Sequence, residues 1–153
     1  FSAFGKMPAP QNHRFNFSAL VTDIVRLYQG NDLKLSKSIE PDLYVYADPK
    51  LFSQILNNLL LNAIQAIKSQ EKVISVALKS KSGKVMCSVK DNGKGIPEEI
   101  KHKIFTPYFS TKEKGSGIGL ALAKKGIEQA NGSIWFESRE NEGTTFYFML
   151  PIS

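Results

Sequence analysis

The sequence contains very little cysteine, and this shortage excludes two classes of protein. Cys87 is the one cysteine among 153 residues. A single thiol cannot form an internal disulfide framework or a cysteine-based zinc cluster. It is typical of proteins in a reducing compartment, so we expect a cytoplasmic location.

Long apolar runs are missing as well. The longest stretch, around 59–67, is interrupted by Asn62 and Gln65, and it is shorter than the roughly 20 residues that a bilayer requires. The chain shows no signal-peptide pattern of a charged start, an apolar middle and a small-residue cleavage site. We therefore expect no membrane contact by this domain.

Arginine is scarce, although the chain is basic. The formal charge is +6, and arginine occurs only at positions 14, 26 and 139, so lysine carries almost all of the positive charge. Reading of DNA bases prefers arginine, whereas lysine acts as a point charge. Because the lysines are interleaved with acidic residues, a solvated surface is favoured and no nucleic-acid partner is expected. A basic nucleic-acid-binding module remains the weaker alternative.

The apolar pattern predicts one α/β domain in which about three helices pack on a mixed sheet, as a two-layer sandwich. Three substantial helices are predicted over 18–28, 49–69 and 118–131, and a short helix over 97–105. Strands are predicted over 33–39, 43–47, 73–80, 84–90, 133–139 and 144–150. Ser18 and Asp48 are the predicted N-caps, and Gly30 and Gly132 the residues that end helices. The strand over 43–47 is predicted to form a hairpin with the strand over 33–39.

A stripe of amides marks the helix that follows Pro49. Its members fall on one side of the helix at spacings of four, four and three: Gln54, Asn58, Asn62 and Gln65. Leu61 and Ile64 border this stripe, which favours a partly enclosed cleft. Amide oxygens can bind Mg²⁺, which takes few protein ligands and completes its shell with water and phosphates. A solvated face that uses amides in place of charges is the alternative.

The segment Asp91–Gly95 ends a strand with an acid and two glycines. By the period of two, Asp91 continues the face of Val85, Cys87 and Val89. A carboxylate aimed at the edge of the core needs a donor, and an adenine amino group would serve. By the same parity Thr144 shares the face of Phe146 and Phe148. A surface turn is the alternative interpretation.

Three glycines, at 115, 117 and 119, lead directly into the helix predicted over 118–131. Free N–H groups and the helix dipole make such a start suited to phosphate. The pattern lacks the spacing of a Walker loop, and no strand precedes it as a dinucleotide motif requires. A flexible loop with glycines at the helix start is the alternative.

The order of these segments resembles the catalytic, ATP-binding domain of sensor histidine kinases, within the Bergerat-fold superfamily that includes gyrase, Hsp90 and MutL. Five segments carry the resemblance: Ser53–Ala66 (N box), Asp91–Gly95 (first glycine box), Ile104–Lys112 (F box), Gly115–Leu120 (second glycine box) and Gly143–Phe146 (closing Gly-Thr segment). The similarity spans roughly residues 17–151. It divides the chain into 1–16, the tail of a dimerisation helix with its linker, and 17–153, the ATP-binding catalytic domain. Phe1–Pro10 resembles the end of that helix in nitrogen-regulation-type kinases.

The resemblance implies roles for individual residues. Asn62 would coordinate Mg²⁺, with Asn58 supporting the metal and the phosphates. Asp91 would accept from the adenine amine of ATP, with Thr144 assisting through water. The remaining nucleotide-binding residues would be Gly93, Gly95 and Ile96 around the base, and Lys112, Gly117, Gly119 and Leu120 around the phosphates. Asn58 and Lys112 would be catalytic. Many relatives carry a basic residue where this chain has Gln65, and whether Gln65 or Lys68 takes its place is left open.

The activity implied is transfer of the γ-phosphoryl group to a histidine on a dimerisation domain, and from there signalling to a cognate response regulator. Hydrolytic members of the superfamily place a glutamate where this chain has Asn58, which cannot act as a general base. Neither His13 nor His102 has the setting of an acceptor, so we expect no autophosphorylation by the chain alone. A Bergerat-type ATPase and a serine kinase acting on a regulator are the alternatives. The domain is expected in the cytoplasm, also where its parent protein is anchored in a membrane.

Overall fold

The structure is a computed structural model that describes residues 8–30, 32–110 and 118–153. Its strands are β1 (His13–Asn16), β2 (Leu33–Ile39), β3 (Tyr44–Ala47), β4 (Lys72–Lys81), β5 (Lys84–Asp91), β6 (Ser133–Arg139) and β7 (Gly143–Pro151). Its helices are α1 (Phe17–Tyr28), α2 (Pro49–Ala66), the 3₁₀-helix η1 (Glu98–Lys103) and α3 (Gly119–Gln129). No helix among the described residues is long and apolar enough to cross a membrane.

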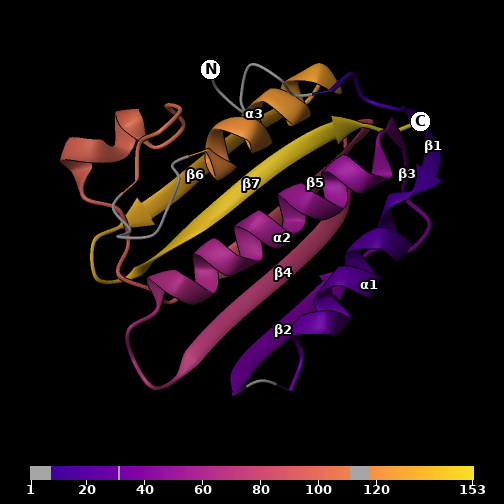
Figure 1. Ribbon diagram of the computed structural model, residues 1–153. Coiled ribbons are helices and arrows are strands. Elements are labelled where there is room, and N and C mark those ends of the chain that lie inside the picture. The colour runs from indigo at the N-terminus through magenta and orange to yellow at the C-terminus, as the bar shows by residue number, and fades with distance from the viewer. Residues whose placement is uncertain (1–7, 31, 111–117) are drawn as a thin grey trace.

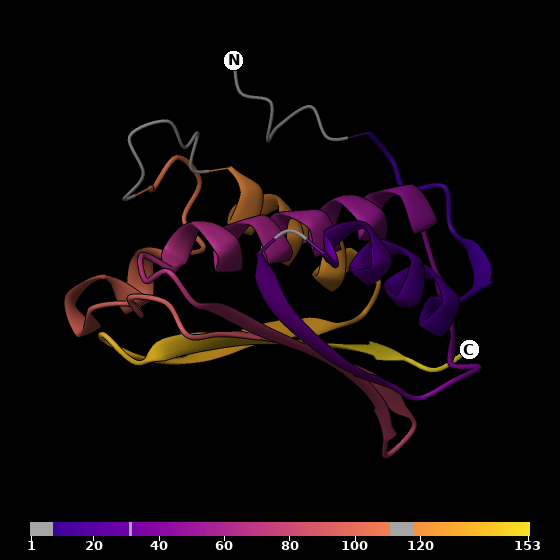
Figure 2. The same ribbon diagram turned by 90° about the horizontal axis from the view of Figure 1, so that it is seen from below.

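The main sheet has five strands in the order β2-β4-β5-β7-β6 (Figure 1). β2 and β4 are parallel, and the other three pairs are antiparallel, so the sheet is mixed as predicted. Seen edge-on, α1, α2 and α3 lie on the same side of the sheet (Figure 2). The prediction of a two-layer sandwich is confirmed.

One strand pairing was predicted wrongly. β3 does not form a hairpin with β2; it pairs antiparallel with β1 in a separate two-stranded sheet. β2 instead pairs along its whole length with β4, which follows α2 in the chain. The hairpin prediction rested on sequence proximity, whereas a parallel pair needs a long connection that a local pattern does not show. The sequence predicted no strand at His13–Asn16.

The helix starts follow the rule that a polar side chain caps the first free N–H groups. Asp48 caps α2 as predicted, and its Oδ1 accepts from the amide of Lys50 at 3.0 Å. The predicted cap of α1 was wrong. Asn16 accepts from the amide of Ala19, whereas Ser18 donates to the carbonyl of Glu40 at 2.6 Å and accepts from the amide of Leu43.

Two predicted helix ends also shift. α2 ends at Ala66, three residues before the predicted end, and Ile67 is its C-cap. After α3 the left-handed residue is Asn131, with φ of 64°, rather than Gly132. The amide of Gly132 then donates to the carbonyl of Ile127 at 2.9 Å, which closes the helix as a Schellman motif. The segment 97–105 contains a 3₁₀-helix where a short helix was predicted.

The core lies between the three helices and the inner face of the sheet. Phe17 of α1, Phe52 of α2 and Phe148 of β7 are fully buried, and their ring centroids lie 5.9 to 6.1 Å apart. The alternation predicted for β5 and β7 is confirmed, because every second residue of each strand is buried. This alternation turns Asp91 and Thr144 toward the helices, where the end of β5 lies beside the start of β7.

Candidate functional site

A cavity of about 1270 Å³ opens between the C-terminal half of α2, the loop after β5, and the start of α3. This volume exceeds the roughly 300–1,000 Å³ of typical small-molecule sites, so a nucleotide fits. Residues from η1, from the segment after it and from the β6–β7 turn complete the walls. Most of the segments singled out in the sequence therefore meet around one cavity.

Asp91, the last residue of β5, lies in the wall of this cavity and is only 5% exposed. Its Oδ1 accepts from the amide of Gly93 at 2.8 Å and from the amide of Thr144 at 3.3 Å. Burial raises the pKa of Asp91 above its ordinary value, and the two amide hydrogen bonds lower it in part. Among the described residues, the second oxygen, Oδ2, has no hydrogen-bond partner. It is therefore available to a donor on a ligand.

The hydroxyl group of Ser138, on β6, connects β7 to the loop after β5. Ser138 Oγ accepts from the amide of Ile96 at 2.8 Å and lies 2.7 Å from Thr144 Oγ1. It also lies 3.1 Å from the carbonyl of Gly143, to which it can donate. Thr144 is 5% exposed, so its hydroxyl needs such a partner. The sequence analysis did not single out Ser138, because its position opposite Thr144 depends on the register of β6 against β7, which a single strand does not show.

The two glycines of the loop after β5 are required by close approaches on opposite sides. A Cβ atom on Gly93 would lie 2.6 Å from the carbonyl oxygen of Ala66, at the end of α2. Gly95 has a φ of 71°, and a Cβ there would overlap the carbonyl of Arg139. Gly95 and Ile96 line the cavity, whereas Gly93 packs against α2. The loop is therefore held between α2 and the β6–β7 turn.

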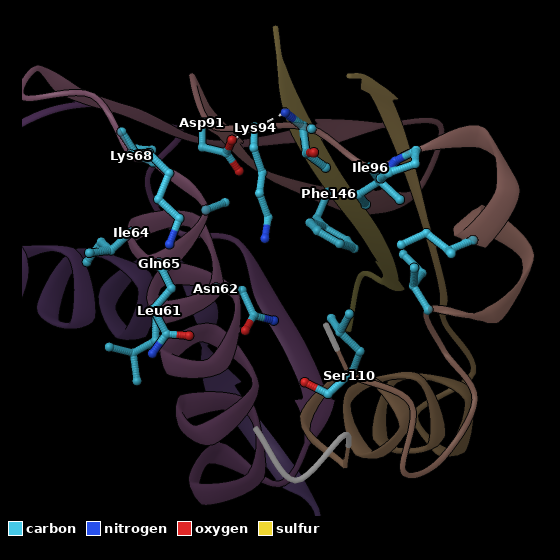
Figure 3. Close-up of a pocket in the computed structure, with 18 of the residues that line it drawn as sticks. Leu61, Asn62, Ile64, Gln65, Lys68, Asp91, Lys94, Ile96, Ser110 and Phe146 are labelled. Atoms are coloured by element: carbon cyan, nitrogen blue, oxygen red, sulfur yellow. Dashed lines mark hydrogen bonds between the residues drawn. The ribbon is translucent and has the colours of Figure 1, made fainter. Parts of the chain in front are cut away.

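α2 contributes amides to the cavity, as the stripe in the sequence predicted. Asn58, Asn62 and Gln65 line it together with Leu61 and Ile64, whereas Gln54 does not. In Figure 3 the side chain of Asn62 extends from α2 toward the middle of the cavity. Among the described residues, no group of three or more His, Cys, Asp and Glu side chains could hold a metal ion. The Asn58 and Asn62 oxygens nevertheless fit Mg²⁺, because this ion needs only one or two protein ligands beside phosphates and water.

The remaining wall comes from the segment after η1 and from the start of α3. Phe109, Ser110, Gly119 and Leu120 line the cavity there. A Cβ atom on Gly119 would lie 3.5 Å from the side chain of Asn58, so the start of α3 faces the amides of α2. The predicted phosphate residues Lys112 and Gly117 lie outside the described residues.

An aromatic cluster fixes the segment after η1 against the sheet. The ring centroids of Phe105, Phe136 and Phe146 lie 5.7 to 6.3 Å apart. Phe146 also lines the cavity beside Ile96 (Figure 3). The apolar wall near Asp91 therefore belongs to the packed structure, and a flat ring bound there would lie against it.

Comparison with known proteins agrees with this geometry. Residues 47–153 match the model of the family described as "Histidine kinase-, DNA gyrase B-, and HSP90-like ATPase". The chain belongs to this ATPase family. The nucleotide-free catalytic domain of histidine kinase ThkA has the same fold, with a TM-score of 0.82 and 35% identity, and the match covers 93% of this chain and 98% of that one.

The curated relatives are sensor kinases. "Sensor histidine kinase ZraS" of Escherichia coli (strain K12) is 47% identical over 109 residues, which are 71% of this chain and 23% of ZraS. "Adaptive-response sensory kinase SasA" of Gloeothece citriformis is 39% identical over 130 residues, which are 82% of this chain and 33% of SasA. The chain thus spans about a quarter to a third of these relatives. It is the catalytic, ATP-binding domain of a two-component sensor histidine kinase, as the resemblance implied.

Proposed function

We propose that this histidine kinase domain binds ATP with Mg²⁺ in the cavity between α2 and α3, with the base at Asp91 and the metal at Asn62 and Asn58. The observation that carries the proposal is the placement of Asp91. One of its oxygens is held by two amides, and the other has no protein partner among the described residues. The exocyclic amine of adenine would donate to that second oxygen.

The same placement would distinguish adenine from guanine. In GTP a carbonyl replaces the amine, so the Asp91 carboxylate would face an acceptor. A buried pair of acceptors should cost about 1–3 kcal/mol. Thr144, whose hydroxyl contacts Ser138, would assist the base through a water molecule, and Gly95 and Ile96 would border the ring.

The side of the cavity lined by the asparagine side chains of α2 would hold the metal and the phosphates. Asn62 would bind Mg²⁺ directly, and Asn58, four residues earlier on α2, would support the metal and the phosphates. When bound, the ion would neutralise charge on the phosphates during transfer. The backbone at Gly119 and Leu120, in the first turn of α3, would face the phosphates, since free N–H groups of a helix start favour anions. Lys112 and Gly117 remain predicted phosphate contacts.

Phosphoryl transfer to a protein fits these residues better than hydrolysis does. Activation of water needs a general base, and the amide of Asn58 is not one at neutral pH. His13 and His102 do not line the cavity. The acceptor would therefore be a histidine on a dimerisation domain of the longer protein, preceding the catalytic domain at residues 17–153. A crystal structure of ThkA, a kinase of the same fold, contains this kinase in complex with the response regulator protein TrrA. We infer that the present kinase also has a cognate response regulator.

Radiolabelled ATP tests whether the chain binds nucleotide without phosphorylating itself. The chain alone, incubated with [γ-³²P]ATP and Mg²⁺, should bind nucleotide without acquiring stoichiometric acid-labile phosphate. Stoichiometric labelling would show an acceptor within the chain and contradict the proposal. Substantial release of inorganic phosphate would instead identify an ATPase, and labelling of a serine on an added regulator would identify a serine kinase.

A further inference from the structure

We propose that Lys68 and Lys94 together form a cationic wall that binds the phosphates of ATP. Both lysines line the cavity. The sequence left open whether Lys68 replaces the basic residue that many relatives carry at the position of Gln65, and it gave Lys94 no role. The inference rests on the proposed function, because it concerns the phosphate end of the same site. It starts from a contact between the end of α2 and the loop after β5.

Backbone contacts hold the two lysines close to one another. The amide of Lys94 donates to the carbonyl of Ala66 at 2.9 Å, and Lys68 follows Ala66 by two residues. On the other side, the carbonyl of Lys94 accepts from the amide of Asn141 at 2.6 Å. Lys94 is thus fixed between α2 and the β6–β7 turn, and only its side chain is left to move.

The side chains extend into the cavity from its upper rim (Figure 3). In that view the Lys94 ammonium group points from the Asp91 end toward Asn62, and the Lys68 ammonium group lies beside Gln65. A nucleotide with its base at Asp91 and its metal at Asn62 would pass between these two ends. Its phosphates would then lie within reach of both lysines.

The charges of the cavity walls are unbalanced at this point. Two ammonium groups that line the same cavity repel each other unless an anion lies nearby. Among the described residues, no carboxylate comes within 4.0 Å of either group, whereas other lysines, such as Lys34 and Lys101, form ion pairs. Of the described residues that line the cavity, Asp91 and Glu140 are the acids. Asp91 is assigned to the base, so within the part of the wall that the structure describes Glu140 is the remaining acid, and it stands against Lys68, Lys72 and Lys94.

The side of the cavity formed by α2 is uncharged. α2 presents Asn58, Asn62 and Gln65 to the cavity, and none of these amides carries charge. ATP remains negative when Mg²⁺ is bound, so neutral amides leave part of its charge unpaired. Lysine binds phosphate as a point charge through three donors. Lys68 and Lys94 would supply the positive charge that α2 lacks.

A purely structural role is the competing explanation. Cations near the last turn of a helix stabilise it, and both lysines lie near the carbonyl end of α2. That role would change the stability of the free protein and would treat all nucleotides and nucleosides alike. A phosphate-binding role would affect ATP and leave adenosine unchanged.

The test compares ATP with adenosine on matched variants of the chain. Kd values for both ligands, with Mg²⁺, are measured by ¹⁵N NMR titration for the wild type, Lys68→Met, Lys94→Met and the double methionine variant. We expect the double variant to bind ATP about 10- to 100-fold more weakly, as for lost hydrogen bonds to a charged group, with adenosine affinity unchanged. The double arginine variant should keep most of the ATP affinity.

Lys90→Met serves as the control for a lost positive charge. Lys90 is exposed, and it precedes Asp91 in β5, so its side chain lies on the opposite face of the sheet. Equal losses for ATP and adenosine, an unchanged ATP affinity, or the same loss in Lys90→Met would each overturn the inference. If the wild type binds neither ligand, the proposed function itself fails, which is a different result.

Discussion

Thr144 lies directly opposite Asp91 in the pairing of β5 with β7, and its amide donates to the Asp91 carboxylate at 3.3 Å. The register of two strands therefore fixes the orientation of an acid that a local turn alone would leave variable. Gly93 supplies the second amide at 2.8 Å. Both donors are backbone groups, so the orientation of Asp91 depends on the fold and not on a neighbouring side chain.

The first prediction concerns the ionisation of Asp91. Burial raises its pKa above 3.8, so the folded state favours the protonated acid. The stability that this preference contributes is complete below pH 3.8 and is lost as the pH rises through the folded-state pKa. Titration of the Asp91 carboxyl carbon by ¹³C NMR should therefore give a midpoint above 3.8. A midpoint at or below this value would contradict the desolvation argument.

The substitution Asp91→Asn should change how the stability of the domain depends on pH. The asparagine amide oxygen can still accept from Gly93 and Thr144, but it carries no charge that is costly to bury. Relative to the wild type, the free energy of unfolding of this variant should rise as the pH increases from 3.8 through the folded-state pKa of Asp91, because the wild-type acid ionises over that range. Urea denaturation at several pH values measures this difference. A difference that falls over the same range would show that the buried carboxylate stabilises the fold.

Ser138→Ala should weaken the loop after β5. The substitution leaves the amide of Ile96 and the hydroxyl of Thr144 without the partner that now lies within 2.8 Å of each. A lost hydrogen bond at a partly buried site costs about 1–3 kcal/mol. Urea denaturation gives the loss of stability, and NMR titration should show weaker binding of ATP.

Ser36→Ala is the matched control for that variant. Ser36, an exposed residue of β2, donates to Ser75 at 3.0 Å, and neither serine lines the cavity. Its loss should change stability by less than about 0.5 kcal/mol. Equal effects of the two substitutions would remove the special role given to Ser138.

Gly93→Ala tests the contact between the loop and α2. The new methyl group would lie 2.6 Å from the carbonyl of Ala66, so either the loop or the helix end must move. Such overpacking costs about 1–3 kcal/mol, which thermal unfolding can measure. Gly119→Ala is the control, because its methyl group would meet Asn58 at an ordinary 3.5 Å. Similar melting temperatures for both variants would contradict the predicted clash.

The sequence predicts those parts of the site that depend on local periodicity. The period of two correctly turned Asp91 and Thr144 inward, and the helical period correctly brought Asn58 and Asn62 to one face. Each of these inferences needs only the residues of one strand or one helix. They were confirmed because a buried face repeats along the element.

Features that depend on tertiary contacts were missed. Asn16 and Ser18 are both good N-caps by type, and the choice between them was decided by the contacts of Ser18 with Glu40 and Leu43. The pairing of β3 with β1 was equally hidden from a local pattern. The role of Ser138 depends on the register of β6 against β7, which no single strand shows. Such features require the register between segments far apart in the chain.

Calorimetric titration of the chain with Mg²⁺-ATP, beside Asp91→Asn and Asn62→Ala, tests the central assignment most directly. We predict that the wild type binds ATP and discriminates against GTP, and that each variant binds ATP at least about tenfold more weakly, as expected for a lost hydrogen bond to a charged group or a lost metal ligand. Variants that fold and bind ATP as tightly as the wild type would contradict the placement of the base at Asp91 and of the metal at Asn62.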